Sequence, residues 1–258
     1  MRDLAVTAIG AELERLVSRA SFELGSRELC ALERARDAER EPTARSIMQQ
    51  LVDNAAIARA ERRPLCQDTG VAVVFLDIGQ EVHLTGGDLE TAVHAAIARA
   101  YADNFLRKSL VRHPLVRKNT GDNTPAVIHT RIVPGDRVRI RFDAKGGGCE
   151  NMSRVAMLMP SDGRAGVIRA IVETVRAAGG NPCPPVIVGV GLGGTFEKAA
   201  LLAKEALLRP LGDPADDPFD AELETELFAA IQATNVGPQG FGGQTTALAV
   251  HVISHPCH

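Results

Sequence analysis

The chain has 258 residues, 45% of them hydrophobic, and a formal net charge of -3 from 29 basic and 32 acidic residues. This is enough apolar content for one sizeable core or two smaller lobes. The charge balance provides no basic surface for nucleic acid or an anionic membrane, and no apolar run approaches the roughly 20 residues that span a bilayer. We therefore expect neither nucleic acid nor a membrane as a partner.

The N-terminus and the cysteine pattern indicate a reduced, cytoplasmic protein. The first residues lack the basic start, the apolar segment and the small-residue cleavage site of a secretory signal. The odd number and wide spacing of the cysteines argue against a disulfide framework, and no CxxC pair is present to suggest a zinc knuckle. Any metal site must assemble from distant parts of the chain. The cysteines are Cys30, Cys66, Cys149, Cys183 and Cys257.

The first 63 residues are predicted to be mainly helical. Apolar residues recur at helical spacing, for example Ile9, Leu13 and Leu16, in a segment rich in Ala, Leu, Arg and Glu. Breaks are expected at Gly25 and Pro42, because glycine ends helices and proline favours their first turn.

The middle of the chain predicts a strand, a helix and a hairpin. The β-branched run Val71–Ile78 is typical of a buried strand, and a helix is expected over Leu89–Phe105. Two β-rich segments, Ala126–Val133 and Arg137–Phe142, are separated by Pro134-Gly135-Asp136. This turn signal predicts that the two segments pair as a β-hairpin.

The last third alternates helices and strands. Thr195 is the expected N-cap of one of these helices, because threonine is favoured there. The predicted elements are a helix over Gly163–Ala178, a strand over Val186–Val190, a helix over Phe196–Leu208, a helix over Ala221–Ala233 and a strand over Thr245–Ile253.

This order of elements favours the α+β class, with a helical N-terminal lobe followed by mixed or antiparallel sheets covered by helices. We predict one domain over residues 1–258. It consists of the helical lobe 1–63 and an α+β part, 64–258, that carries the chemistry.

Polar and glycine-rich clusters contain the candidate functional residues. Loops favour binding and catalysis, and glycine lets backbone N–H groups approach an anion closely. The segment Gly191-Leu-Gly-Gly194 could equally be a bare tight turn, and neither a P-loop nor a dinucleotide fingerprint is present, which disfavours nucleotide binding. The clusters are Pro64–Gly70, Lys118–Pro125, Lys145–Asn151, Asn181–Gly194 and Gly237–Thr246.

Two cysteines stand out by their surroundings. Cys183 lies between prolines, where extended backbone can project its sulfur toward a ligand, and Cys66 opens a polar turn. The usual alternative for a cysteine is a small buried apolar side chain. We accept that alternative for Cys30, on a Leu-rich helix.

Six motifs in a fixed order resemble the alpha region of class I fumarases and tartrate dehydratases, and the resemblance covers most of the chain from Arg63 onward. The motifs are Cys66-Gln-Asp-Thr-Gly70, Asn119-Thr-Gly-Asp-Asn-Thr-Pro125, Lys145-Gly-Gly-Gly148 with Glu150-Asn151, Cys183-Pro-Pro185, Gly191-Leu-Gly-Gly-Thr195 and Gly237-Pro-Gln-Gly-Phe-Gly-Gly243.

The resemblance implies an iron-sulfur site. In that family three cysteines hold a [4Fe-4S] cluster whose fourth iron binds substrate, and Cys66 and Cys183 match two of the ligands. The family's third cysteine follows the segment aligned with Pro256-Cys257-His258, so the chain is expected to stop just before it. Cys149 and Cys257 replace a common Ser and Thr, and we treat each as a weaker ligand candidate.

The resemblance also implies residues that bind and process a small dicarboxylate. Gln67 and Asp68 match residues beside the cluster, and Arg107 suits a bidentate carboxylate contact. The backbone of Gly146, Gly147 and Gly148 is expected to hold a further carboxylate oxygen. His258 matches a histidine that pairs with the acid corresponding to Asp68, so these two are the catalytic candidates.

Simpler roles remain open for several of these residues. Arg107, near a helix end, could complement the helix dipole, and Lys145 could be either solvated or an anion contact. For Asp122 we favour an Asx-turn within its motif.

The function predicted by the resemblance is reversible hydration of fumarate to malate. In the family the base and most carboxylate-binding arginines belong to a beta region, so a beta subunit is the expected partner and the protein is expected to be oligomeric. One alternative is the alpha subunit of an L(+)-tartrate dehydratase. The other is a non-catalytic binding module without an intact cluster.

Overall fold

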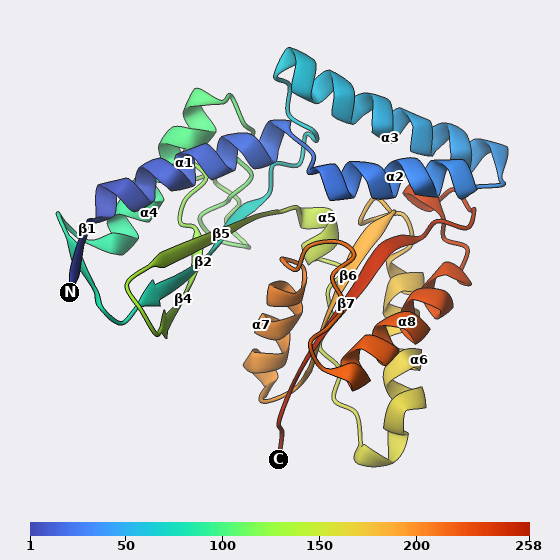
Figure 1. Cartoon of the computed structure of the whole chain (residues 1–258). Coiled ribbons are helices and arrows are strands. Elements are labelled where there is room, and N and C mark those ends of the chain that lie inside the picture. The colour runs from blue at the N-terminus through green and yellow to red at the C-terminus, as the bar shows by residue number, and fades with distance from the viewer. The chain divides into compact units, whose positions relative to one another are not determined.

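The computed structural model describes all 258 residues, and the chain forms two compact units. Unit 1 combines Met1–Leu24 with Ala55–Gly147, and unit 2 combines Gly25–Asn54 with Gly148–His258. The residues of the expected helical lobe 1–63 are thus divided between the units, and the assignment of the whole chain to one domain stays a prediction. Figure 1 shows the chain, with the helices and all strands except β3 labelled.

The elements of unit 1 are β1 (Arg2–Ala5), α1 (Val6–Phe22), β2 (Val71–Gly79), β3 (Val82–Thr85), α4 (Leu89–Asp103), β4 (Val127–Val133) and β5 (Val138–Lys145), with residues 55–61 of α3 (Pro42–Glu61). The first strand occupies residues where a helix was expected, because β1 pairs in parallel with β3.

The elements of unit 2 are α2 (Ser26–Ala38), residues 42–54 of α3, α5 (Gly147–Glu150), α6 (Gly163–Ala178), β6 (Val186–Gly193), α7 (Phe196–Ala206), α8 (Pro218–Gln232) and β7 (Ala247–His255), with short 3-10 turns at Pro160–Asp162 and Pro238–Gly240. The helix breaks expected at Gly25 and Pro42 are confirmed, as is the mixed α+β class.

The predicted hairpin is wrong, because β2 lies between its two strands. The sheet order is β4-β2-β5, with β4 parallel and β5 antiparallel to β2. Nearly all residues of β2 are buried, and the buried N–H and C=O groups on both edges of such a strand need hydrogen-bond partners. The segment after β4 passes the end of β2, where Gly79 N–H donates to Arg137 O at 2.8 Å. The local turn signal was correct, but the pairing was not.

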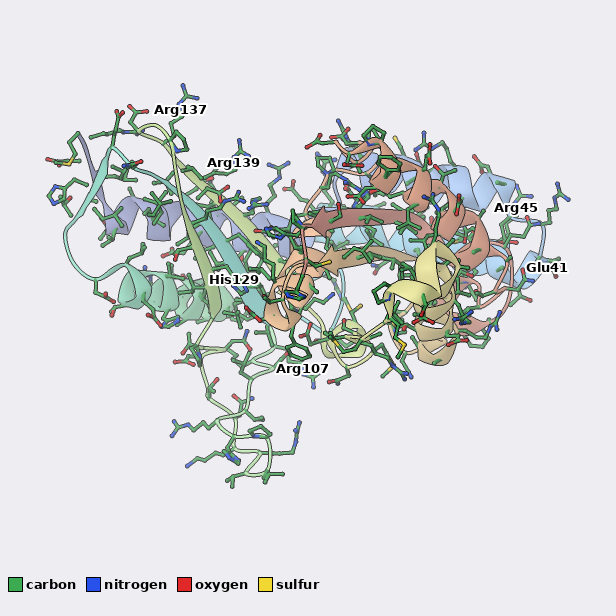
Figure 2. The ribbon with its side chains drawn as sticks, turned by 90° about the horizontal axis from the view of Figure 1, so that it is seen from below. Glu41, Arg45, Arg107, His129, Arg137 and Arg139 are labelled. Atoms are coloured by element: carbon green, nitrogen blue, oxygen red, sulfur yellow. The ribbon has the colours of Figure 1, made fainter.

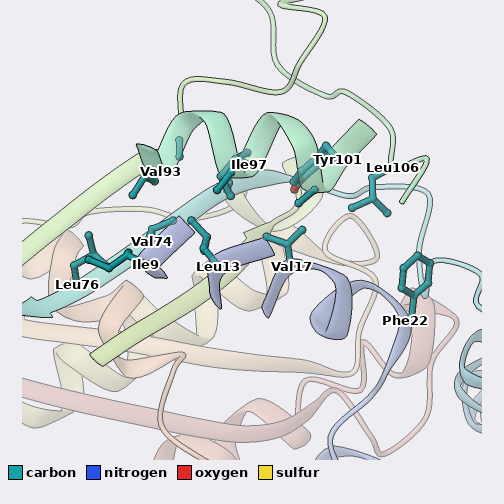
Figure 3. Close-up of a cluster of buried hydrophobic side chains, with 14 of the residues drawn as sticks. Ile9, Leu13, Val17, Phe22, Val74, Leu76, Val93, Ile97, Tyr101 and Leu106 are labelled. Carbon is teal, nitrogen blue, oxygen red and sulfur yellow. The ribbon is translucent and has the colours of Figure 1, made fainter. Parts of the chain in front are cut away.

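The core of unit 1 forms between the sheet and two helices. Ile9, Leu13 and Val17 follow each other at intervals of four on α1, so one face of the helix is apolar. Figure 3 shows these side chains meeting those of β2 and α4, among them Leu76 and Ile97.

The core of unit 2 lies beside a two-stranded parallel sheet of β6 and β7. Leu227 and Ile231 of α8 are fully buried against Val250 and Val252 of β7, and apolar residues of α6 pack on the same cluster. Helix α7 contacts both strands as well. None of the helices of the chain combines the length and the apolar character needed to cross a bilayer.

We expect Leu13→Ala to lower the free energy of unfolding by about 2–5 kcal/mol, because the substitution leaves a cavity around a side chain that is 0% exposed. Urea unfolding followed by circular dichroism measures the change. The matched control is Ile57→Ala on α3, whose side chain is 49% exposed and which should cost less than about 1 kcal/mol. Equal effects of the two substitutions would contradict the placement of this core.

Candidate functional site

In unit 1 the turn that contains Cys66 is held beside the end of β5. The register pairs Val71, the first residue of β2, with Lys145, the last residue of β5. Gly70 has a φ of +68°, and a β-carbon there would lie 2.6 Å from the Lys145 carbonyl carbon, so glycine permits this close approach. The sheet therefore brings residues 66–70 next to residues 145–147.

Asp68 is fixed by backbone N–H groups on both sides of this junction. Its Oδ1 accepts from Gly70 N–H at 3.2 Å, and its Oδ2 accepts from Gly147 N–H at 2.7 Å. Two residues predicted to bind substrate, Asp68 and Gly147, are therefore bonded to each other. The Gly147 N–H is already used, which leaves Gly146 as the other predicted N–H donor in this unit.

Tyr101 of α4 holds the same turn through its buried hydroxyl. Its hydroxyl donates to Thr69 O at 2.6 Å, and Thr69 Oγ1 donates to Arg107 O at 2.6 Å. Burial, with added repulsion from the carboxylates of Asp143 and Asp68, raises the pKa of Tyr101 to about 12. The phenol therefore stays a neutral hydrogen-bond donor, and it links α4 to the Cys66 turn.

The motif Asn119–Pro125 organises the loop that follows α4. Asn123 is fully buried; its Oδ1 accepts from Ser109 N–H at 2.7 Å, while its Nδ2 donates to Gly70 O at 3.1 Å. Asp122 Oδ1 accepts from Thr124 N–H at 3.0 Å, which confirms the Asx-turn expected for Asp122. The motif holds the Arg107 loop against Gly70, and Arg107 itself is exposed, as labelled in Figure 2.

In unit 2 Cys183 lies on a turn that a second loop secures. Cys183 is exposed and has a φ of +56°, and its N–H donates to Gly180 O at 3.0 Å. Pro184 O accepts two bonds from Gln239, one from its N–H at 2.7 Å and one from its Nε2 at 3.1 Å. The glycine-rich turn before β7 therefore fixes the backbone beside Cys183.

Cys149 lies next to the same segment. Its Sγ donates to Pro182 O at 3.6 Å, and the neighbouring Glu150 forms an ion pair with Lys204 of α7 at 2.5 Å. These contacts place Cys149 near the residue that precedes Cys183. Gly148 belongs to this unit, whereas Gly146 and Gly147 belong to unit 1.

The segment Gly191–Thr195 has a packing role. A β-carbon on Gly191 would overlap Ala199 O of α7, so this glycine allows the helix to pack closely on β6. Thr195 occupies the N-cap position of α7, but its side chain does not cap the helix as expected. Its hydroxyl bonds to Glu197 instead, at 2.7 Å.

His258 is exposed at the edge of an open hollow of about 490 Å³ near the start of α7, which Lys198 and Cys257 also line. Asp68 and His258 belong to different units, so their pairing stays a prediction.

None of the five cysteines forms a disulfide, and no group of three or more His, Cys, Asp or Glu side chains is placed to hold a metal ion. Cys66 and Cys183 are nevertheless exposed and unbridged, and each lies on a turn next to a strand. Thiol sulfur is the donor type that iron-sulfur clusters require.

Within unit 1 the structure brings together Cys66, Gln67, Asp68 and Gly146, and the Arg107 backbone joins them through Thr69. Three supporting residues were missed by sequence reasoning, namely Tyr101, Asn123 and Gln239. Asn123 and Gln239 carried a signal, since each lies within one of the motifs. The structural role of Tyr101 depends on tertiary contacts that its helical sequence does not reveal.

Comparison with known proteins gives consistent matches. A family model described as "Fumarate hydratase (Fumerase)" matches residues 11–258. The chain is 39% identical over 234 residues to the "Putative L(+)-tartrate dehydratase subunit alpha" of Methanocaldococcus jannaschii, which covers 88% of this chain and 82% of that protein. It is 35% identical over 230 residues to the L(+)-tartrate dehydratase subunit alpha of Escherichia coli strain K12, with 88% and 76% covered.

We expect the only tyrosine, Tyr101, to ionise near pH 12 in the folded protein. Its folded pKa lies above the unfolded value of about 10, so the unfolded state loses the proton first and stability falls as pH rises from about 10 to 12. Below pH 10 the group contributes no pH dependence. Ultraviolet absorbance measures the titration directly, because the chain has no tryptophan.

Tyr101→Phe is the control. It should cost about 1 kcal/mol at neutral pH, by leaving Thr69 O without its donor, and should remove the extra loss of stability between about pH 10 and 12. A normal tyrosine titration near pH 10 in the folded protein would refute the buried position of this hydroxyl.

Proposed function

Because the chain belongs to the fumarate hydratase (Fumerase) family, we propose that it is the alpha subunit of a hydro-lyase that adds water to, or removes it from, a small dicarboxylic acid. The observation that carries the proposal is the family match across residues 11–258. The fixed geometry of the Cys66–Gly70 turn supports it, because that turn presents a thiol, an amide and a carboxylate side by side.

We propose Cys66 and Cys183 as ligands of a [4Fe-4S] cluster. Both thiols are exposed and unbridged, so their sulfurs are free to bind metal. When bound, such a cluster supplies a Lewis acid that makes a substrate hydroxyl a better leaving group. The remaining steps depend on side chains that bind substrate and carry protons.

We propose that Gln67, Asp68 and Arg107 bind substrate together with backbone N–H groups of Gly146 and Gly148. The Gly147 N–H is bonded to Asp68 and holds that carboxylate in place instead. Arg107 is exposed, and its planar fork matches a carboxylate in a bidentate contact. The two hydrogen bonds from backbone N–H groups hold the Asp68 carboxylate in one orientation. Its remaining lone pairs can accept a hydrogen bond from a substrate hydroxyl.

For proton transfer we propose Asp68 and His258. A carboxylate held by backbone N–H groups can accept a proton at Oδ1 without reorienting, and an imidazole can accept a proton at one ring nitrogen while it donates one from the other. The base that removes the proton from the neighbouring carbon of the substrate is expected to come from the beta subunit.

A beta subunit is the proposed partner, because the matched relatives are named as alpha subunits. Two substrates are supported by different observations. Fumarate is the first candidate, since the family model is described as fumarate hydratase. L(+)-tartrate is the second, since the named relatives are L(+)-tartrate dehydratase subunits.

Turnover of fumarate, mesaconate and L(+)-tartrate by the chain co-purified with a beta subunit distinguishes the substrates. We expect kcat/KM for fumarate to exceed that for L(+)-tartrate by at least about tenfold, because a fumarate site supplies no polar partner for the second hydroxyl of L(+)-tartrate, which would be desolvated and left unpaired. Turnover of L(+)-tartrate alone would assign the protein to the second candidate.

Anaerobic reconstitution with iron and sulfide tests the ligands. We expect Cys66→Ala and Cys183→Ala each to lose most of the bound iron, because each removes one thiolate. Cys30→Ala, on α2, is the matched control and should retain the iron of the parent chain. Iron and sulfide quantitation with electron paramagnetic resonance gives the result, and a parent chain that binds no cluster beside its beta subunit would favour the binding-module alternative.

A further inference from the structure

Glu39 is a buried carboxylate without a cationic partner. It follows the last residue of α2, three residues before α3 begins, and it is only 3% exposed. An isolated buried charge is costly, so its environment must supply compensating hydrogen bonds.

Four backbone N–H groups surround this carboxylate. Oε1 accepts from Arg40 N–H at 3.0 Å and from Glu41 N–H at 3.2 Å. Oε2 accepts from Gln244 N–H at 2.9 Å and from Thr245 N–H at 3.0 Å. Two donors therefore come from the α2–α3 corner, and two come from the glycine-rich turn more than 200 residues later.

The hydrogen bonds determine the charge state of Glu39. Burial acts to raise its pKa, but bonds from Gln244, Glu41 and Thr245 outweigh burial and hold the pKa below its usual value. The group is thus a carboxylate at neutral pH. Four N–H donors suit an acceptor-only anion, whereas a neutral amide would direct its own donors at two of them.

The turn that Glu39 holds is the one that contacts the Cys183 segment. Gly237 N–H donates to Thr246 Oγ1 at 3.1 Å, and Gly242 N–H donates to Val236 O at 2.9 Å, which closes the turn on itself. Gln239 at its tip donates twice to Pro184 O. Every contact in this series lies within unit 2.

We propose that Glu39 is a positioning residue for Cys183. Its carboxylate anchors residues 237–246, and Gln239 of that turn holds the backbone that presents the Cys183 thiol. A role for Cys183 as a cluster ligand rests on the proposed function, but the anchoring itself does not.

Residue-resolved hydrogen exchange on the full chain, free of cluster, tests the anchoring. We expect Glu39→Gln to speed exchange of the Gln244 and Thr245 amides by about tenfold. Loss of one charge-assisted hydrogen bond raises the population of the locally open state by about this factor. The Cys183 amide, bonded to Gly180 O, should speed up as well. Amides of Val250 and Val252 in β7 should keep their rates.

Two further variants make the test specific. Glu41→Gln removes one negative charge from the same corner, and because Glu41 is exposed at the surface, as in Figure 2, it should leave all these rates unchanged. Gln239→Leu removes the side-chain bond to Pro184 O without altering a buried charge. It should speed exchange at Cys183 but not at Gln244, and it keeps the test available if Glu39→Gln does not fold.

The outcomes separate the anchoring from the cluster assignment. The proposal is overturned if Glu39→Gln speeds exchange at Gln244 and Thr245 while the Cys183 amide keeps its rate in both Glu39→Gln and Gln239→Leu. An equal increase across β7 also overturns it. After reconstitution we expect Glu39→Gln to retain at most about half of the iron, while Glu41→Gln retains it all. If exchange behaves as expected but Cys183→Ala still binds a full cluster, the anchoring stands and the ligand assignment fails.

Discussion

The burial of strand β2 on both faces is the constraint on which unit 1 depends. The backbone N–H and C=O groups on both edges of a buried strand need hydrogen-bond partners, and β4 and β5 supply them on opposite sides of β2. The register that results pairs Val71 with Lys145 and Val73 with Val127. The loops before β2, before β4 and after β5 therefore meet at one end of the sheet. Asp68 reaches Gly147, and Asn123 reaches Gly70, because of this arrangement.

Unit 2 reaches a similar result with fewer strands. Because β6 and β7 are parallel, the segments that precede them lie at the same end of the sheet. One of these segments presents Cys183, and the other is the glycine-rich turn that contains Gln239. Parallel pairing also requires a long connection between the strands, and this connection contains α7 and α8. Helix α8 packs on the core, and α7 contacts both strands. In both units the proposed cluster ligand precedes the first residue of a strand by only a few positions, which ties its thiol to rigid backbone.

Local patterns in the sequence predicted most elements but not their pairing. The apolar periodicity of residues 163–178 and the β-branched run from Val71 correspond to α6 and β2. The Pro134-Gly135-Asp136 signal predicted a turn correctly, yet a turn does not specify which strand lies beside it, and the hairpin was wrong. Of the site, the cysteines and loop motifs could be predicted because their composition is unusual. Glu39 could not, because a glutamate at a helix end is ordinary until a distant turn supplies its N–H donors.

The discontinuous composition of the units has a consequence for how the chain folds during synthesis. All residues of unit 1 have been made once the ribosome passes Gly147, so its core can form first. Residues 25–54 emerge early, but their own core needs the last hundred or so residues, which take roughly 10 s at ordinary elongation rates. During that interval α2 and the start of α3, which carry the buried side chains Leu32 and Met48, lack the rest of unit 2. These two helices are therefore where a chaperone would find the nascent chain most exposed.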